Sequence, residues 1–290
     1  MNNIEETFTQ QIQPICDAVV KIKPLVHCIT NYVTVNDCAN MVLAAGGSPI
    51  MADDIGEVEE IVTICNSLVI NIGTLNERTI RSMFHAGKKA KALNHPVILD
   101  PVGAGASRLR TDTAAALLRE VHPSVIRGNL SEMQTLAGEE GHTRGVDAAE
   151  PEEKTQTTTM SQAESVCKAS SAVLARRLAA TTGSVIAVTG AIDYVSNGKI
   201  IAAVSNGNKM MARITGSGCM LSALIGAWCG ANPDNLFYST VLAIAAMGIC
   251  GERAAAVSTG TGSFRTGLID AMSVLDANAI QEGIRIEFGE

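Results

Sequence analysis

The sequence has few aromatic residues and no excess of positive charge. Aromatic side chains make up only 3% of the 290 residues, whereas glycine alone occurs 26 times. The interior is therefore expected to be packed from Ala, Val, Ile and Leu, with helices lying close to a sheet. The net charge of −7 and the pI near 5.3 argue against a nucleic-acid-binding protein, which would carry a basic patch or stripe.

Clusters of cysteine and histidine are absent as well. The eight cysteines form no C-x-x-C pair, and the five histidines lack the spacing of metal ligands. The cysteines are therefore expected to be small buried hydrophobes in a reducing compartment. Residues 1–13 are polar and acidic, without the apolar segment of a signal peptide. Together these features predict a cytoplasmic protein.

No segment is long and apolar enough to predict a membrane span. The longest uncharged window, residues 235–251, has about 17 residues, fewer than the roughly 20 needed to cross a bilayer. It is interpreted as a helix buried in the core.

Three common catalytic motifs are missing. There is no G-x-x-x-x-G-K-[ST] motif of P-loop proteins, no complete dinucleotide fingerprint, and no G-x-S-x-G elbow. These absences argue against a P-loop nucleotidase, a Rossmann dehydrogenase and a Ser–His–Asp hydrolase.

Apolar strands alternate with helical segments along most of the chain. Hydrophobic residues make up 47% of the sequence, enough for a large core. Strands that are apolar throughout predict a parallel sheet buried on both faces. Asn197-Gly198 between two short apolar runs predicts a β-hairpin, which would lie toward one edge. We predict an α/β fold in one domain, residues 1–290: a doubly wound, mostly parallel central sheet flanked by helices.

The expected boundaries follow from these patterns. Strands are expected at 25–30, 48–52, 67–73, 96–103, 124–129 and 184–191, and the hairpin at 193–196 and 200–204. Helices are expected at 3–22, 34–45, 56–65, 75–94, 111–121, 131–137, 161–181, 218–230, 235–257 and 264–281. Residues 139–160 are polar and without periodicity, which is typical of a solvated loop.

Polar or functional side chains follow most of the predicted strands. In open α/β sheets, ligands bind beyond the carboxyl ends of the strands. Each residue has a simpler explanation on its own, since an Asp can cap a turn and a Glu can begin a helix. Their joint placement predicts one polar rim, made of Asn31, Met51, Asn71, Asp100, Arg127, Asn129, Glu132 and Thr189.

Residues 215–219, Thr-Gly-Ser-Gly-Cys, lead directly into an apolar run of helical length. Gly216 and Gly218 let the backbone approach a ligand closely, and the start of the helix directs unpaired N–H groups into one small volume. Such a turn binds an anion, most often a phosphate, although a plain connection between a strand and a helix fits the pattern equally well. Cys219 is expected in the first helical turn, where the helix dipole would lower the pKa of its thiol.

Five segments match one known family in order. They are His-Cys-Ile-Thr-Asn-Tyr-Val-Thr at 27–34, Asp-Pro-Val-Gly-Ala at 100–104, Arg-Gly-Asn-Leu-Ser-Glu at 127–132, Val-Thr-Gly-Ala-Ile-Asp-Tyr-Val at 188–195 and Thr-Gly-Ser-Gly-Cys-Met-Leu at 215–221. Together they resemble the hydroxyethylthiazole kinase family of the ribokinase-like superfamily. The resemblance implies ATP- and Mg²⁺-dependent phosphorylation of the primary hydroxyl of 4-methyl-5-(2-hydroxyethyl)thiazole, a thiamin salvage step. It also implies a homotrimer with active sites between subunits.

The resemblance assigns roles to particular residues. It implies that Met51, Gly216 and Asn31 bind the thiazole, and that Cys219 faces the substrate hydroxyl, either as a base or only to position it. Mg²⁺ prefers a few carboxylates together with water and phosphate oxygens, which suits the Mg²⁺ site that the resemblance implies at Asp100 and Glu132. The residues it implies for ATP or its phosphates are Arg127, Thr189, Asn129 and Gly218.

One segment departs from the family pattern, and two other functions remain open. Residues 148–162 are interpreted as an inserted surface loop, since long insertions cost little closure entropy. One rival function is a ribokinase-like dehydratase of a damaged nicotinamide dinucleotide, which an open pocket near Met51 would favour. The other is a non-catalytic thiazole or nucleotide sensor, against which the joint presence of Asp100, Glu132 and Cys219 argues.

Overall fold

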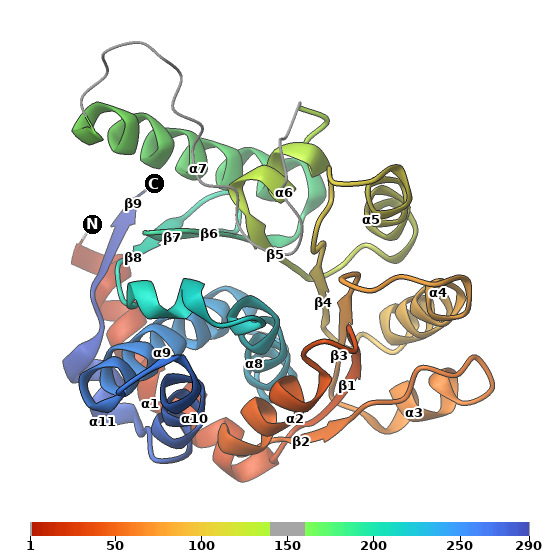
Figure 1. Cartoon of the computed structure of the whole chain (residues 1–290), viewed down its shortest axis with the longest axis horizontal. Coiled ribbons are helices and arrows are strands. Elements are labelled where there is room, and N and C mark those ends of the chain that lie inside the picture. The colour runs from red at the N-terminus through yellow and green to blue at the C-terminus, as the bar shows by residue number, and fades with distance from the viewer. Residues whose placement is uncertain (1, 140–159, 290) are drawn as a thin grey trace.

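A computed structural model describes residues 2–139 and 160–289. Among these residues, nine strands form one sheet in the order β2-β1-β3-β4-β5-β6-β7-β8-β9 (Figure 1). The neighbouring strands from β2 to β6 pair in parallel, and β7, β8 and β9 continue the sheet in antiparallel fashion. The strands are β1 (Leu25–Ile29), β2 (Ser48–Ile50), β3 (Ser67–Asn71), β4 (Val97–Asp100), β5 (Val125–Asn129), β6 (Val185–Thr189), β7 (Asp193–Ser196), β8 (Ile201–Val204) and β9 (Ile286–Gly289).

The order of the strands places a topological switch point between β1 and β3. The chain leaves β1 to form β2 on one side and then returns to form β3 on the other side. The connections on the two sides of β1 therefore diverge, and a ligand-binding crevice is expected beyond the carboxyl ends of β1 and β3.

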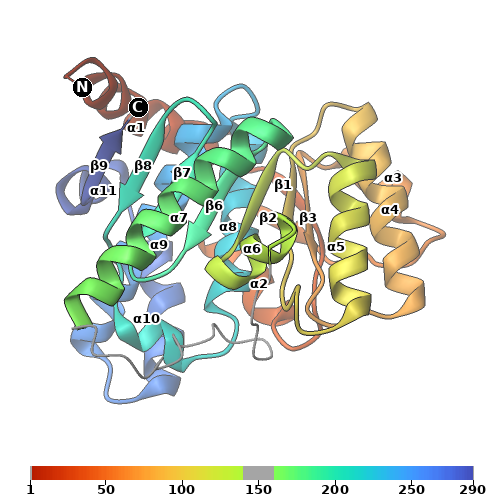
Figure 2. The same cartoon turned by 90° about the horizontal axis from the view of Figure 1, so that it is seen from above.

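Helices cover both faces of the sheet, as Figures 1 and 2 show from two directions. Each face carries its own cluster of buried apolar side chains. One layer contains α1 (Asn2–Ile22), α2 (Val35–Ala44), α8 (Ser217–Ala231), α9 (Leu236–Val257), α10 (Thr261–Ser273) and α11 (Ala277–Gly283). The other contains α3 (Val58–Ile64), α4 (Glu77–Ala92), α5 (Arg108–Val121), α6 (Leu130–Leu136) and α7 (Met160–Thr182).

This architecture confirms the predicted doubly wound α/β fold, and the predicted hairpin is β7 and β8. Of the helices that the structure describes, α9 alone has the length and hydropathy of a membrane span, but 72% of its apolar window is buried inside the molecule. The interpretation of this segment as a core helix is therefore confirmed.

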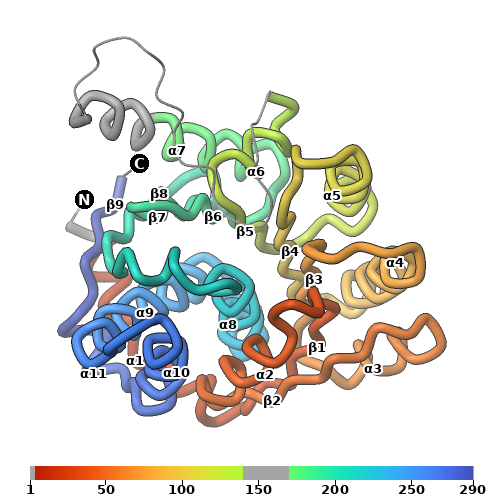
Figure 3. The backbone as a smooth tube through the Cα atoms, viewed as in Figure 1, coloured from red at the N-terminus to blue at the C-terminus, as the bar shows by residue number. Residues whose placement is uncertain are grey.

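The C-terminal region differs from the prediction. Instead of one helix at 264–281, the chain forms α10 and α11, because Asp276 caps a new helix by accepting a hydrogen bond from the Ala279 N–H at 2.8 Å. Strand β9, which the sequence pattern did not predict, then pairs with β8 at the edge of the sheet. The two ends of the chain lie near each other at this edge (Figure 3). The rings of Phe8 in α1 and Phe288 in β9 are 5.1 Å apart between centroids.

Two further segments complete the comparison with the prediction. A short 3₁₀ helix, η1 (Lys209–Arg213), precedes the glycine turn and was not predicted. Of the predicted insertion at 148–162, residues 148–159 lie outside the described residues, and α7 begins at Met160.

Candidate active site

Helix α8 begins beneath the carboxyl ends of the central strands. It packs against β1, β3 and β4, and its N-cap residue, Gly216, has φ of 86°. A Cβ atom at this position would lie 2.4 Å from Cγ2 of Thr34, so both the backbone conformation and the space require glycine. The first N–H groups of the helix have no partner within it, and they lie at the carboxyl ends of the strands that α8 covers.

The thiol of Cys219 lies between two asparagine side chains. Asn31, just beyond β1, and Asn71, at the end of β3, each donate an Nδ2–H hydrogen bond to Sγ at 3.2 Å. The two amides also bond to each other, Asn31 Nδ2 to Asn71 Oδ1, at 3.0 Å. Cys219 is thus held at the switch point of the sheet, and only 5% of its surface is exposed.

The electrostatic surroundings of Cys219 differ from the prediction. Burial raises the pKa of its thiol, and the nearby charge of Asp100 raises it further. Hydrogen bonds from Thr34, Asn71 and Asn31 act in the opposite direction but do not outweigh burial. The expectation that the start of the helix would lower this pKa is therefore wrong, because desolvation dominates, and the thiol is neutral near pH 7.

Asp100, at the end of β4, is fully buried. Its Oδ2 accepts hydrogen bonds from Asn71 Nδ2 and Ser222 Oγ, both at 2.8 Å. Its Oδ1 is buried without a hydrogen-bond partner and lies 3.7 Å from Nη1 of Arg127. Burial raises the pKa of Asp100 to about 7, Glu132 adds to this rise, and the charge of Arg127 opposes it.

Glu132 and Asn129 form the N-terminal cap of α6. The side chain of Asn129 accepts a hydrogen bond from the Glu132 N–H, and Glu132 Oε2 accepts one from the Asn129 N–H, both at 2.9 Å. The second oxygen, Oε1, accepts a hydrogen bond from the Gly103 N–H at 2.9 Å. Burial raises the pKa of Glu132, while these backbone hydrogen bonds lower it. The carboxylate is thus fixed beside the loop that follows β4.

Arg127 connects β5, β6 and the start of α8. Its Nη2 donates to Thr189 Oγ1 at 2.8 Å, and a Cβ atom on Gly218 would lie only 2.5 Å from its Nη1. The edge of the guanidinium that carries Nη1 and Nη2 therefore faces the first turn of α8, and its buried Nε–H has no partner among the described atoms. Asp193 lies near this group, and burial raises the pKa of its carboxyl to about 6.

The residues present fit a hard, oxygen-preferring cation. Oδ1 of Asp100 is a buried carboxylate oxygen without a partner, and both oxygens of Glu132 keep acceptor capacity beyond one backbone N–H each. Among residues 2–139 and 160–289, no group of three or more His, Cys, Asp or Glu side chains gathers around a common point. A site with one or two carboxylates suits Mg²⁺, which keeps waters and phosphate oxygens among its ligands.

Most of the residues predicted from the sequence are in direct contact. Asn31 contacts Cys219, Asn129 contacts Glu132, and Arg127 joins Thr189, Gly218 and the region of Asp100. Met51, beyond β2, is partly buried and packs against the apolar cluster that contains α8, without a direct polar link to the others.

Three residues of the site did not stand out in the sequence. They are Ser222, which bonds to Asp100; Thr34, whose Oγ1 bonds to Asn31 Oδ1 at 3.1 Å; and Arg110, whose Nη2 donates to the Gly73 carbonyl at 2.6 Å. Ser222 was detectable, because its position three residues after Cys219 places both on one face of a helix.

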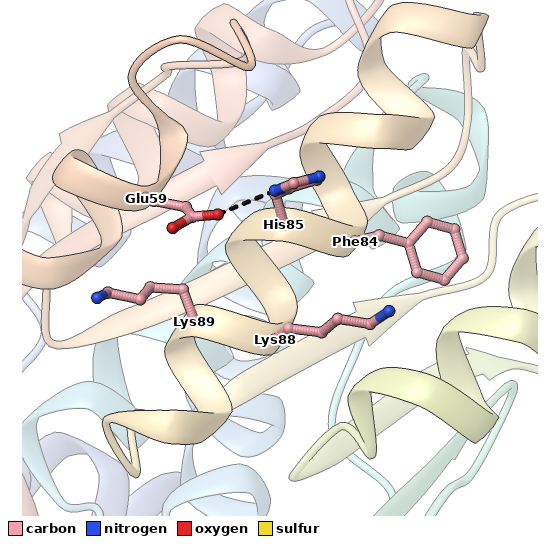
Figure 4. Close-up of a pocket in the computed structure, with 5 residues that line it drawn as sticks. All are labelled: Glu59, Phe84, His85, Lys88 and Lys89. Atoms are coloured by element: carbon pink, nitrogen blue, oxygen red, sulfur yellow. Dashed lines mark hydrogen bonds and ion pairs between the residues drawn. The ribbon is translucent and has the colours of Figure 1, made fainter.

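A surface hollow elsewhere does not have these properties. It lies between α3 and α4 and is lined by Glu59, Phe84, His85, Lys88 and Lys89 (Figure 4). His85 Nδ1 is bonded to Glu59 at 2.9 Å, and Lys88 Nζ is bonded to Glu120 at 2.7 Å. His85, Glu59 and Lys88 are exposed and already paired, and the hollow lies on the surface of the helices, away from the strand ends. The candidate active site is therefore at the strand ends.

Comparisons with known proteins agree with this assignment. The hydroxyethylthiazole kinase family matches residues 16–278. A hydroxyethylthiazole kinase of Ruminiclostridium cellulolyticum is 49% identical, covering 96% of this chain and 98% of its own length. The structure of hydroxyethylthiazole kinase protein from Pyrococcus horikoshii superimposes with a TM-score of 0.84 at 34% identity, covering 97% of this chain and 100% of that one.

More distant structures share the fold alone. A ribokinase-like superfamily protein of Enterococcus faecalis has a TM-score of 0.58 at 12% identity, over 86% of each chain. From the matched length, the identity and the shared fold, this chain belongs to the hydroxyethylthiazole kinase family.

Proposed function

We propose that this chain transfers the γ-phosphoryl group of ATP to the primary hydroxyl of 4-methyl-5-(2-hydroxyethyl)thiazole. The observation that supports this most strongly is the convergence of Cys219, Asp100 and Arg127 at the N-terminus of α8, in a member of this family. The three side chains come from β4, β5 and the first turn of α8, and they meet at the carboxyl edge of the sheet. Phosphoryl transfer is mostly positioning and charge stabilisation, and this edge offers both.

The thiazole would bind in the crevice between β1 and β3. Met51 would supply an apolar contact, and Gly216 would allow the ring to approach the backbone. Asn31 would lie beside the hydroxyethyl group, since its amide already contacts Cys219 at 3.2 Å.

The phosphates of ATP would bind on the other side of the α8 N-terminus. Arg127 presents a guanidinium whose Nε–H is buried and unpaired among the described atoms, and Thr189 shares its position through a hydrogen bond of 2.8 Å. The N–H groups near Gly218 would stabilise charge on the transferred group. Asn129 would contribute by holding Glu132 in place.

Asp100 and Glu132 would hold Mg²⁺, directly or through its waters. When bound, this ion would neutralise charge on the phosphate oxygens. The protein's own residues hold the two carboxylates in place. Asn71 and Ser222 donate hydrogen bonds to Asp100, and two backbone N–H groups donate to Glu132.

Cys219 would position the substrate hydroxyl rather than act as a strong base. Its raised pKa keeps the thiol protonated near pH 7, so a thiolate that accepts a proton is the minor form. In a loose transition state the alcohol keeps its proton until late, so a strong base is not required. Orientation of the hydroxyl at the sulfur is then the main contribution of this residue.

The assembly and the location of the protein are part of the same proposal. We expect a homotrimer with active sites between subunits, in the cytoplasm, and an inserted surface loop at 148–162 that does not take part in catalysis. Deletion of the loop should leave the KM for ATP unchanged.

A coupled assay of ATP consumption tests the proposed function. The purified chain with Mg²⁺ and ATP should consume ATP only when the thiazole is added, and a phosphorylated thiazole should appear in equal amount. Dehydration of a hydrated nicotinamide dinucleotide would instead support the lyase, and binding of the thiazole without turnover would support a sensor. Either result would rule out the proposed kinase.

A further inference from the structure

Asn71 is buried at the centre of the site, and all of its polar atoms are used. Its Nδ2 donates to Asp100 Oδ2 at 2.8 Å and to Cys219 Sγ at 3.2 Å. Its Oδ1 accepts from Asn31 Nδ2 at 3.0 Å and from the Gly73 N–H at 2.9 Å. One carboxamide therefore contacts both a predicted metal ligand and the thiol that is predicted to face the substrate.

The orientation of this amide is fixed by the backbone. A backbone N–H can only donate, so the atom that faces Gly73 must be the oxygen of Asn71. The amide of Asn31 is fixed in the same way, because its Oδ1 accepts from the Thr34 N–H at 3.1 Å. Both Nδ2 groups consequently point at Cys219, and neither amide can turn without leaving a buried donor unpaired.

This arrangement restricts the thiol of Cys219. The sulfur accepts hydrogen bonds from two N–H donors, so the S–H bond must point away from both amides. A thiol without these donors would be free to rotate and to direct its hydrogen at Asp100 or at the amide oxygens. Thr34, whose side chain also hydrogen-bonds the thiol, borders the sulfur as well.

We propose that Asn71 is a positioning residue for the phosphoryl transfer, which holds Cys219 and Asp100 in a fixed relation through its two N–H groups and turns the thiol toward the substrate hydroxyl. This inference rests on the proposed kinase function. The Nδ2 group of Asn71 would act in positioning the thiol and Asp100, whereas its Oδ1 has a structural role in the turn at Gly73.

The substitution Asn71→Asp separates the two roles. The aspartate keeps an oxygen for Gly73 and Asn31 but replaces the donor with an acceptor that faces Cys219 and Asp100. Ser222→Ala is the matched control, since Ser222 donates to the same Asp100 oxygen at the same 2.8 Å without a hydrogen bond to Cys219. Circular dichroism should show that both variants fold.

Two measurements test the proposal. In steady-state kinetics, Asn71→Asp should lower kcat by about 10-fold or more and change the KM for the thiazole by less than about 3-fold, because the loss concerns orientation in the transition state. In the free protein, alkylation of Cys219 by iodoacetamide, mapped by mass spectrometry, should show its pH midpoint raised by about one unit, because a carboxylate replaces an N–H donor. Ser222→Ala should leave the midpoint in place.

The other groups that face Cys219 are unchanged in all these proteins. They are Thr34 before α2, Asp100 on β4, Cys38 on α2 and Arg127, whose guanidinium lies against the neighbouring Gly218. If Asn71→Asp does not fold, Asn71→Ala replaces it, with a smaller upward shift expected. An unmoved midpoint or an unchanged kcat in the folded variant would overturn the proposal. Failure of the proposed function would appear differently, as the absence of thiazole-dependent turnover in the wild-type chain.

Discussion

The guanidinium of Arg127 lies against the α-carbon of Gly218, so close that a Cβ atom there would lie 2.5 Å from Nη1. This contact joins the middle of β5 to the first turn of α8, two elements that are far apart in the sequence. It brings a fixed positive charge to the same place as the N–H groups of the helix. The candidate phosphate site is therefore built by packing as much as by the glycine turn itself.

Removal of the thiol tests the role of Cys219. We expect Cys219→Ala to lower the rate of the chemical step by about 10- to 100-fold, the low end for groups that assist proton transfer, because the neutral thiol mainly positions the hydroxyl. Cys219→Asp should retain or raise activity, since a carboxylate accepts a proton more readily than a neutral thiol. Single-turnover kinetics with the thiazole measures both. An unchanged rate in Cys219→Ala would show that the thiol takes no part.

The buried carboxylate of Asp100 should destabilise the free protein at neutral and higher pH. Burial raises its pKa from 3.8 to about 7, so the folded state binds the proton more tightly than the unfolded state does. Its contribution to stability is therefore present below about pH 4 and is lost as the pH rises through 7. Asp100→Asn should stabilise the free protein by about 1–3 kcal/mol at pH 8 while abolishing activity. Urea unfolding at pH 5 and pH 8 checks this, and equal gains at both values would contradict it.

Gly216 should tolerate no side chain, for two separable reasons. Its φ of 86° disfavours other residues, and Thr34 Cγ2 would lie 2.4 Å from a new Cβ. Gly46 has φ of 88° but open space around it, so Gly46→Ala isolates the backbone cost, about 1–2 kcal/mol. Gly216→Ala should cost more than this and impair activity. Thermal unfolding measures the difference, and Thr34→Ser, which removes Cγ2, should recover part of it.

His27 should make the protein sensitive to acid. It is fully buried, its Nε2 is 2.8 Å from the Ala52 carbonyl oxygen, and burial lowers its pKa below 6.5. The unfolded chain then binds a proton more readily, so stability is lost as the pH falls below about 6.5. His27→Gln, which keeps a donor toward Ala52, should flatten the dependence of the unfolding free energy on pH between 5 and 7. An equally steep dependence in the variant would assign the effect to other groups.

The fold was largely predictable because its signals are local. Buried parallel strands are apolar throughout, and glycine, proline and capping residues mark their ends. The rule that ligands bind beyond the carboxyl ends of strands then placed Asn31, Asp100 and Thr189 at one edge. The prediction of one helix at 264–281 was wrong because Asp276 interrupts a helical pattern that continues on both sides of it. Strand β9 was missed because it has only four residues.

The chemistry of the site was less predictable than its location. The pKa of Cys219 depends on burial beneath β1 and β3 and on Asp100, and neither is encoded near residue 219. Asn71 and Ser222 act through contacts with Asp100 that span 29 and 122 positions of the sequence. Roles of this kind arise from the assembled structure. The ligands that the predicted site residues bind remain predictions until they are measured.

The hydrogen bond from Asn31 to Cys219 closes a loop of 188 residues. Such a long separation delays folding, because the entropy of closing the loop is lost before the contact forms. During synthesis, β1, β3 and β4 emerge well before α8, the helix that covers one of their faces. The growing chain therefore exposes apolar strands until residue 231 has been made, and it is at this stage that the protein should depend most on chaperones.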